Sequence, residues 1–156
     1  MTMQRIEGKV DAMIKSIGWE STDERGEPID LKSHFFLYDI YRDFSPLQVG
    51  LKAAQVGWTT MAALKNFYAA EKKHIDSIYT VPTQNDVYTL VGTKINRIIA
   101  ANAHLKSLVA QQDTMERKQI GNNIIYYRGT MTEREALMVS SDLNIHDEED
   151  RSDQMV

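Results

Sequence analysis

The chain has 156 residues, of which 42% are apolar and 26% are charged, a composition typical of one soluble globular domain. It contains no cysteine, which excludes a disulfide framework and any cysteine-ligated zinc or iron–sulfur site. The net charge of −4 gives no overall attraction to nucleic acid, so contact with DNA would need a local basic patch or parts of a protein beyond this chain. No apolar run approaches the length of a membrane span and no signal peptide is recognisable, so we expect a cytosolic protein without a membrane partner.

The first element expected is an amphipathic helix over residues 3–17. Its apolar residues recur at helical spacing, and Gly18 can end it in a left-handed cap. Residues 19–30 mix charges with glycine and proline and show no periodicity, which indicates a linker. We therefore divide the chain into a helix with linker (residues 1–30) and one domain (residues 31–156). The helix can dock on the chain's own core or on a partner subunit.

Residues 30–43 predict a second helix, rich in aromatic side chains and ended by Ser45 and Pro46. An aromatic stripe of this kind more often belongs to the core than to a site that stacks on bases.

The domain is organised around a segment that predicts a phosphate-binding loop. Residues 47–51 read as a buried strand, Gly57 can supply a tight turn, and apolar residues recur at helical spacing from Trp58 onward. This order aims a helix N-terminus at an anion, where unpaired backbone N–H groups can hold phosphate oxygens. The loop and first helical residues are Lys52, Ala53, Ala54, Gln55, Val56, Gly57, Trp58, Thr59 and Thr60.

The match to the usual G-x-x-x-x-G-K-[ST] pattern is incomplete. Lys52 stands where the first glycine belongs, and Trp58 stands where the lysine belongs. A strand, turn and helix whose glycine only relieves strain is therefore the simpler interpretation of the pattern alone. The long side chain of Lys52 can nevertheless fold back toward the phosphates from the other side of the loop.

Further along the chain, strands and helices alternate. Residues 75–81 predict a strand stopped by Pro82, Thr83 can cap the next helix, residues 117–128 predict a hairpin across a Gly-Asn-Asn turn, and residues 132–139 predict a short capped helix. A last strand, residues 143–146, ends in the acidic pair Asp147 and Glu148. The alternation predicts an α/β fold, P-loop NTPase-like, with a largely parallel sheet flanked by helices. The carboxyl ends of such strands would bring the loop and Asp147 to one edge of the sheet.

These segments together resemble the large terminase subunit of tailed bacteriophages, lambda-type. In that family the phosphate loop carries its lysine at the start, followed by small residues, Arg or Gln, an apolar residue, Gly, an aromatic residue and Ser/Thr. Residues 52–59 fit this variant position by position. The resemblance extends over about the last four-fifths of the chain, through the segments 34–46, 81–83, 126–130 and 147–151. The sequence departs from the family at Asn144 and His146, which interrupt the apolar run before the acids.

The resemblance implies roles for the matching residues. In related ATPases the segment just before the first strand borders the adenine, which makes Tyr41, Phe44 and Gln48 candidates for a base pocket. Lys52 and the loop would bind ATP, Thr59 and Asp147 would hold Mg²⁺, and Glu148 would orient and deprotonate the attacking water. On residue pattern alone, an acidic surface run over residues 147–150 is the favoured interpretation of these acids.

The function that the resemblance implies is that of the ATPase of a DNA-packaging motor, which couples ATP hydrolysis to translocation of viral DNA into the procapsid. Its partners would be double-stranded viral DNA, the small terminase subunit, the portal of the procapsid and further copies of the chain, in the host cytoplasm. The alternatives are a helicase-like ATPase of the same core and a non-catalytic interaction module with a decayed phosphate loop. Few residues follow Glu148, so we expect a domain incomplete at its C-terminus, a fragment with little turnover by itself.

Overall fold

The computed structural model describes residues 23–29, 34–43, 45–130 and 140–147. The helices of this part are α2 (Leu37–Arg42), α3 (Trp58–Lys72), α4 (Gln84–Leu90), the π-helical turn η1 (Val91–Ile95), α5 (Asn96–Ala101) and α6 (Ala103–Leu108). The strands are β1 (Ser77–Val81), β2 (Val109–Asp113), β3 (Arg117–Ile120), β4 (Asn123–Gly129) and β5 (Leu143–His146). No helix among the described residues is long and apolar enough to cross a bilayer.

The five strands form one mixed sheet in the order β2-β3-β4-β1-β5. Strand β1 runs parallel to both of its neighbours, β4 and β5, whereas β2, β3 and β4 are joined by antiparallel pairing. The α/β class is therefore confirmed, and the parallel part of the sheet is the part that leads to Asp147. Strand β2 was not expected from the sequence, because its polar residues give no apolar alternation.

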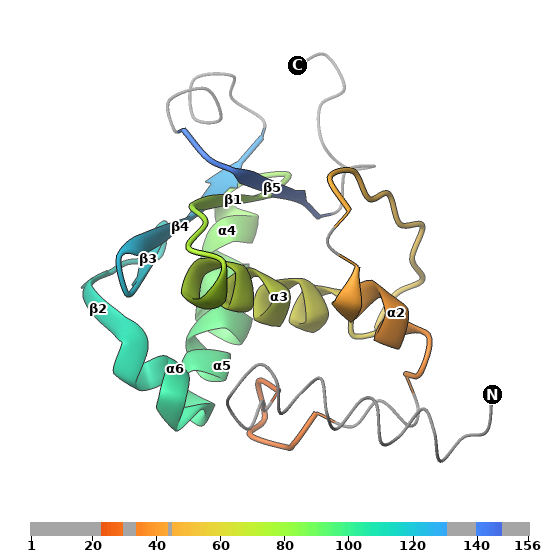
Figure 1. Cartoon of the computed structure of the whole chain (residues 1–156), viewed down its shortest axis with the longest axis horizontal. Coiled ribbons are helices and arrows are strands. Elements are labelled where there is room, and N and C mark those ends of the chain that lie inside the picture. Colours follow the sequence, from red (N-terminus) through yellow and green to blue (C-terminus); the bar gives the residue numbers. More distant parts are fainter. Residues whose placement is uncertain (1–22, 30–33, 44, 131–139, 148–156) are drawn as a thin grey trace.

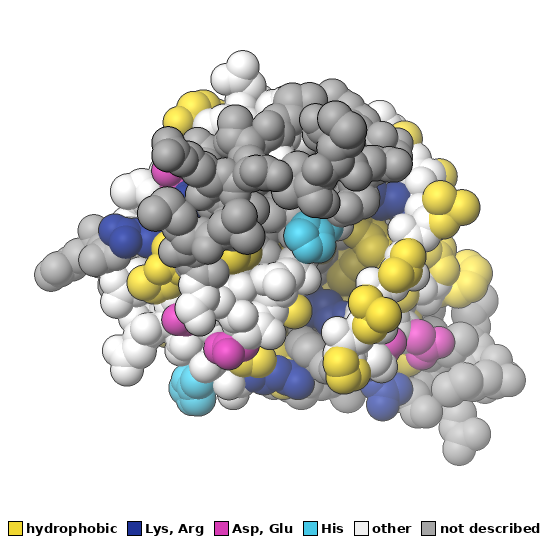
Figure 2. Space-filling view, turned by 90° about the horizontal axis from the view of Figure 1, so that it is seen from above, with side chains coloured by type: hydrophobic (Ala, Val, Ile, Leu, Met, Phe, Trp, Pro, Cys, Tyr) yellow, Lys and Arg dark blue, Asp and Glu magenta, His cyan; other side chains and the backbone are white. Residues whose placement is uncertain are grey.

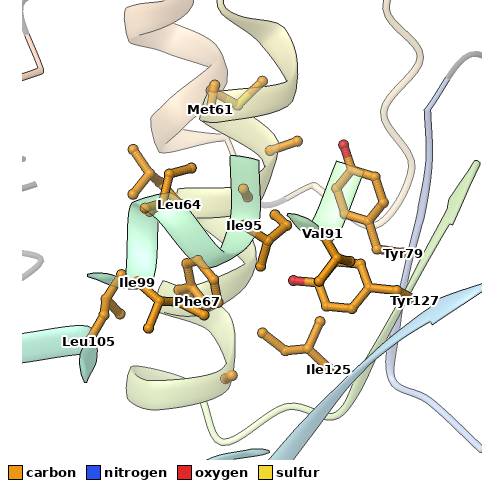
Figure 3. Close-up of a cluster of buried hydrophobic side chains, with 14 of the residues drawn as sticks. Met61, Leu64, Phe67, Tyr79, Val91, Ile95, Ile99, Leu105, Ile125 and Tyr127 are labelled. Atoms are coloured by element: carbon orange, nitrogen blue, oxygen red, sulfur yellow. The ribbon is translucent and has the colours of Figure 1, made fainter. Parts of the chain in front are cut away.

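One face of the sheet packs against α3 and the helical stretch from α4 to α5 (Figure 1). Figure 3 shows side chains of β1 and β4 packed against side chains of α3 and of the helices that follow β1. The labelled residues are Met61, Leu64, Phe67, Tyr79, Val91, Ile95, Ile99, Leu105, Ile125 and Tyr127. A buried hydrogen bond of 2.7 Å from Ser77 Oγ to Asn66 Oδ1 also ties β1 to α3. Helix α3 is thereby fixed against the sheet along its length.

Several local predictions are confirmed. The Thr83 hydroxyl accepts from the backbone N–H of Asp86, and the Asp86 carboxylate accepts from the backbone N–H of Thr83, which makes a complete capping box. The Gly-Asn-Asn turn joins β3 to β4, and the helix expected after Gly57 begins at Trp58. Of the helix expected over residues 30–43, the described part, residues 34–43, contains the shorter α2. The helices expected over residues 3–17 and 132–139 lie outside the described residues.

The prediction of a buried strand over residues 47–51 is wrong. Residues 45–53 form no strand, and Leu47, Val49 and Leu51 are 82%, 92% and 106% exposed. The reason is that a strand forms only where a neighbouring strand takes its backbone hydrogen bonds, and the sheet order places no described strand beside this segment. Figure 2 shows apolar side chains lying on the surface of the molecule in this view.

Candidate functional site

The segment before α3 folds as a tight loop. Gln55 and Gly57 both have positive φ values, 58° and 76°, so the backbone turns twice within three residues before the helix begins. Glycine adopts this left-handed conformation without the steric cost of a Cβ atom, and Gly57 forms the N-cap of α3. The turn leaves the first N–H groups of a 15-residue helix at the end of the loop.

Asp147 is the point where the loop meets the sheet. Its backbone N–H donates to the Thr80 carbonyl at 3.0 Å, which continues the pairing of β5 with β1 by one residue. Its side chain is buried, with 5% of the residue exposed. Three side chains from different elements contact its two carboxylate oxygens.

The first two contacts come from the two ends of the loop. Lys52 Nζ lies 3.1 Å from Asp147 Oδ1, and the Thr59 hydroxyl donates to Asp147 Oδ2 at 2.9 Å. The third contact comes from the sheet, where the Tyr79 hydroxyl donates to the same Oδ2 at 2.9 Å. Oδ1 makes no hydrogen bond within the described part of the chain, so the ion pair with Lys52 is its neutralising contact. A buried carboxylate is stable only when it is paired in this way.

The donor set fits a magnesium ion. A carboxylate and a hydroxyl offer the hard oxygen ligands that Mg²⁺ prefers, and Mg²⁺ is commonly held by one or two carboxylates together with substrate phosphates. Asp147 Oδ1 and Thr59 Oγ1 are the atoms that would bind it, once Lys52 moves toward phosphate. No cluster of three or more His, Cys, Asp or Glu ligands occurs in the described residues, so a metal would depend on oxygens supplied by a ligand.

The remaining loop residues divide between exposed and anchored positions. Ala53, Ala54 and Gln55 are exposed, as loop residues that meet a ligand through their backbone would be. The Thr60 hydroxyl points elsewhere, because it donates to Glu24 Oε2 at 3.1 Å. Glu148, the expected catalytic acid, lies outside the described residues.

Trp58, which occupies the usual lysine position, packs against the segment that enters the loop. A Cβ atom added to Gly50 would lie 2.2 Å from Trp58 Cη2, so the indole ring rests directly on the Gly50 backbone. The ring thus packs the two ends of the loop region against each other. Among the described residues, Lys52 is the cation that pairs with Asp147. The displaced-lysine interpretation stays a prediction, because the observed partner of Lys52 is a carboxylate of the chain.

Two of the base-pocket candidates, Tyr41 and Gln48, have structural roles. Tyr41 is buried in the core, and burial raises the pKa of its hydroxyl. The Gln48 amide donates to the Asp43 carbonyl at 2.8 Å and accepts from Lys65 Nζ at 3.1 Å, which fixes the turn before the loop. Phe44 lies outside the described residues.

Sequence reasoning missed Tyr79. Its residue type in a buried strand signals only core packing, and nothing in the local pattern connects it with Asp147, 68 positions away. The register does connect them, because Tyr79 pairs with Ile145 and residues two apart in a strand share a face.

Comparison with protein-family models, with curated proteins and with solved structures finds no match. The functional argument therefore depends on the geometry of the loop and of Asp147.

Proposed function

We propose that this chain is a P-loop-type ATPase domain that binds ATP and Mg²⁺ at Lys52, Thr59 and Asp147. The observation that carries the proposal is the convergence of these three side chains at the N-terminal end of α3, with distances of 3.1 Å and 2.9 Å to the Asp147 oxygens. A cation, a hydroxyl, a carboxylate and free helical N–H groups at one point are the set that phosphoryl transfer requires.

The roles follow from the chemistry of each group. The N–H groups after Gly57 would hold phosphate oxygens, and Lys52 would neutralise the charge on the transferring phosphate. Thr59 and Asp147 would hold Mg²⁺, which supplies charge neutralisation between the phosphates when bound. Glu148, which follows Asp147 directly, is the proposed base that orients the attacking water.

We further propose, on the resemblance of residues 52–59 and of the acidic pair, that this ATPase belongs to a viral DNA-packaging motor of the large terminase type. It would translocate double-stranded viral DNA in the host cytoplasm. The small terminase subunit, the procapsid portal and further copies of the chain would be its partners.

The proposal is tested by nucleotide binding, because binding reports directly on Lys52, Thr59 and Asp147. Titration calorimetry with ATP and Mg²⁺ should detect binding to the wild type. Lys52→Ala should weaken it about 10- to 100-fold, the range for losing a hydrogen bond to a charged group. Lys106→Ala, which removes an exposed lysine of α6, is the matched control and should bind as the wild type does.

Equal affinities for the wild type and Lys52→Ala would contradict the assignment of the lysine. Absence of any ATP binding by the wild type would reject the ATPase and favour the interaction module.

A further inference from the structure

Tyr79 and Tyr127 form a natural comparison within the core. They are paired in register between β1 and β4, their ring centroids are 5.9 Å apart, and both side chains are almost completely buried. Figure 3 shows the two rings side by side. Their packing environments are therefore closely similar.

The two hydroxyl groups differ. The Tyr79 hydroxyl donates to Asp147 Oδ2 at 2.9 Å, whereas the Tyr127 hydroxyl is buried and has no hydrogen-bond partner in the described part of the chain. Burial of a hydroxyl without a partner is destabilising. The Tyr127 hydroxyl therefore makes no visible contribution to the stability of the core. The Tyr79 hydroxyl, in contrast, donates a hydrogen bond to an oxygen of the candidate site.

The contact fixes the orientation of the carboxylate. Oδ2 accepts from Tyr79 and from Thr59, which leaves Oδ1 as the oxygen directed at Lys52. Thr59 is itself a candidate metal ligand, so binding of a metal would change the surroundings of its hydroxyl. The bond from Tyr79 comes from a buried strand and needs no such change, so it can hold Asp147 in both states.

We propose that Tyr79 is a positioning residue that orients Asp147 for Mg²⁺ through its hydrogen bond to Oδ2. The proposal rests on the ATPase function proposed above and adds a residue that contacts neither nucleotide nor metal. Partners that hold a metal-binding carboxylate in place commonly change metal affinity 10- to 100-fold when they are removed, by comparison with other metal sites.

The test compares Tyr79→Phe with Tyr127→Phe, each of which removes one buried hydroxyl. ATP binding is measured over a range of Mg²⁺ concentrations and again with EDTA, and circular dichroism and melting check the fold. Tyr79→Phe should raise the Mg²⁺ concentration for half-maximal binding about tenfold. Tyr79→Phe should leave the affinity for ATP in EDTA unchanged. Tyr127→Phe should change neither this affinity nor the Mg²⁺ concentration for half-maximal binding.

A double-mutant cycle with Asp147→Asn adds a second measurement, in which the effect of Tyr79→Phe on the Mg²⁺ requirement is compared in two backgrounds. If Tyr79 acts through the carboxylate, its substitution should have no further effect on the Mg²⁺ requirement in the Asp147→Asn background. A wild-type Mg²⁺ requirement in Tyr79→Phe, or equal effects in both backgrounds, would overturn the positioning role alone. Failure of the wild type to bind ATP would reject the proposed function and this inference with it.

Discussion

At the scale of single residues, Asp147 is neutralised by groups of the chain itself. Its carboxylate pairs with Lys52 on one oxygen and accepts hydrogen bonds from Thr59 and Tyr79 on the other. Lys52 therefore occupies the position next to Oδ1 that a metal ion would need. Under the proposed function, phosphate would give the lysine a new anionic partner. Nucleotide and Mg²⁺ should then bind cooperatively, because each favours displacement of the ion pair.

This competition predicts the behaviour of Lys52→Met. Without the ammonium group, Mn²⁺ alone should bind Asp147 about fivefold more tightly, since a partly exposed ion pair is worth up to about 1 kcal/mol. ATP should bind more weakly to the same variant. Calorimetry or electron paramagnetic resonance with Mn²⁺ measures the first effect. Lys52→Arg keeps the charge and serves as the control, and a Mn²⁺ affinity that does not rise in Lys52→Met would argue against competition.

At the scale of elements, the loop is held from both sides although the segment before it is not a strand. Trp58, at the start of α3, rests on Gly50. Lys65, further along the same helix, donates to the Ile40 carbonyl at 2.7 Å and to the Asp43 carbonyl, and so holds the end of α2. Burial lowers the pKa of Lys65, and the nearby Asp43 carboxylate opposes this shift. Helix α3 is thus the frame that positions the loop.

Gly50→Ala should disturb this frame. The added Cβ atom would overlap the Trp58 ring, and overpacking of this kind costs roughly 1–3 kcal/mol of stability. The sequence has two tryptophans, so in a Trp19→Phe background the emission reports Trp58 alone and should shift to the red as the ring is displaced.

Gly92→Ala is the matched control for the same measurements. A Cβ atom there would meet only the flexible end of Met115, at 3.4 Å. If Gly50→Ala has the same melting temperature and emission spectrum as Gly92→Ala, the position of the indole ring does not depend on Gly50.

At the scale of the whole molecule, α3 is joined to α6 by a polar contact. Glu71 Oε1 lies 2.8 Å from His104 Nε2 and 2.9 Å from Lys72 Nζ. Burial acts to raise the pKa of Glu71, but hydrogen bonds from Lys72 and His104 outweigh it and the pKa is lowered in the folded state. The ionised carboxylate therefore stabilises the fold.

The sign of this shift predicts an acid dependence. The contribution is present above the ordinary pKa of 4.5 and is lost as the pH falls below it, through the lowered pKa of the folded protein. Glu71→Gln should therefore unfold at a lower denaturant concentration than the wild type at pH 6. The difference should shrink as the pH is brought below 4.5. A difference between the two proteins that stays constant over this range would exclude Glu71 as its source.

The sequence by itself determined the local structure. The Thr83 capping box, the turn at Gly57, the hairpin between β3 and β4, and the strand that ends at Asp147 all depend on residues a few positions apart. Such features are stabilised by short-range hydrogen bonds and by the period of apolar side chains, which a sequence displays directly. Lys52, Thr59 and Asp147 were selected from an incomplete loop motif and an acidic pair, to which the resemblance to a family gave roles.

Only the tertiary structure decided how these motifs meet. The bond from Thr59 to Asp147 joins residues 88 positions apart, and the contact of Tyr79 with Asp147 follows from the register of β1 beside β5. Strand order and register are set by the packing of the whole sheet, which no local pattern encodes. The same reason explains the error at residues 47–51. An apolar alternation was present there, but no strand of the described residues lies beside this segment.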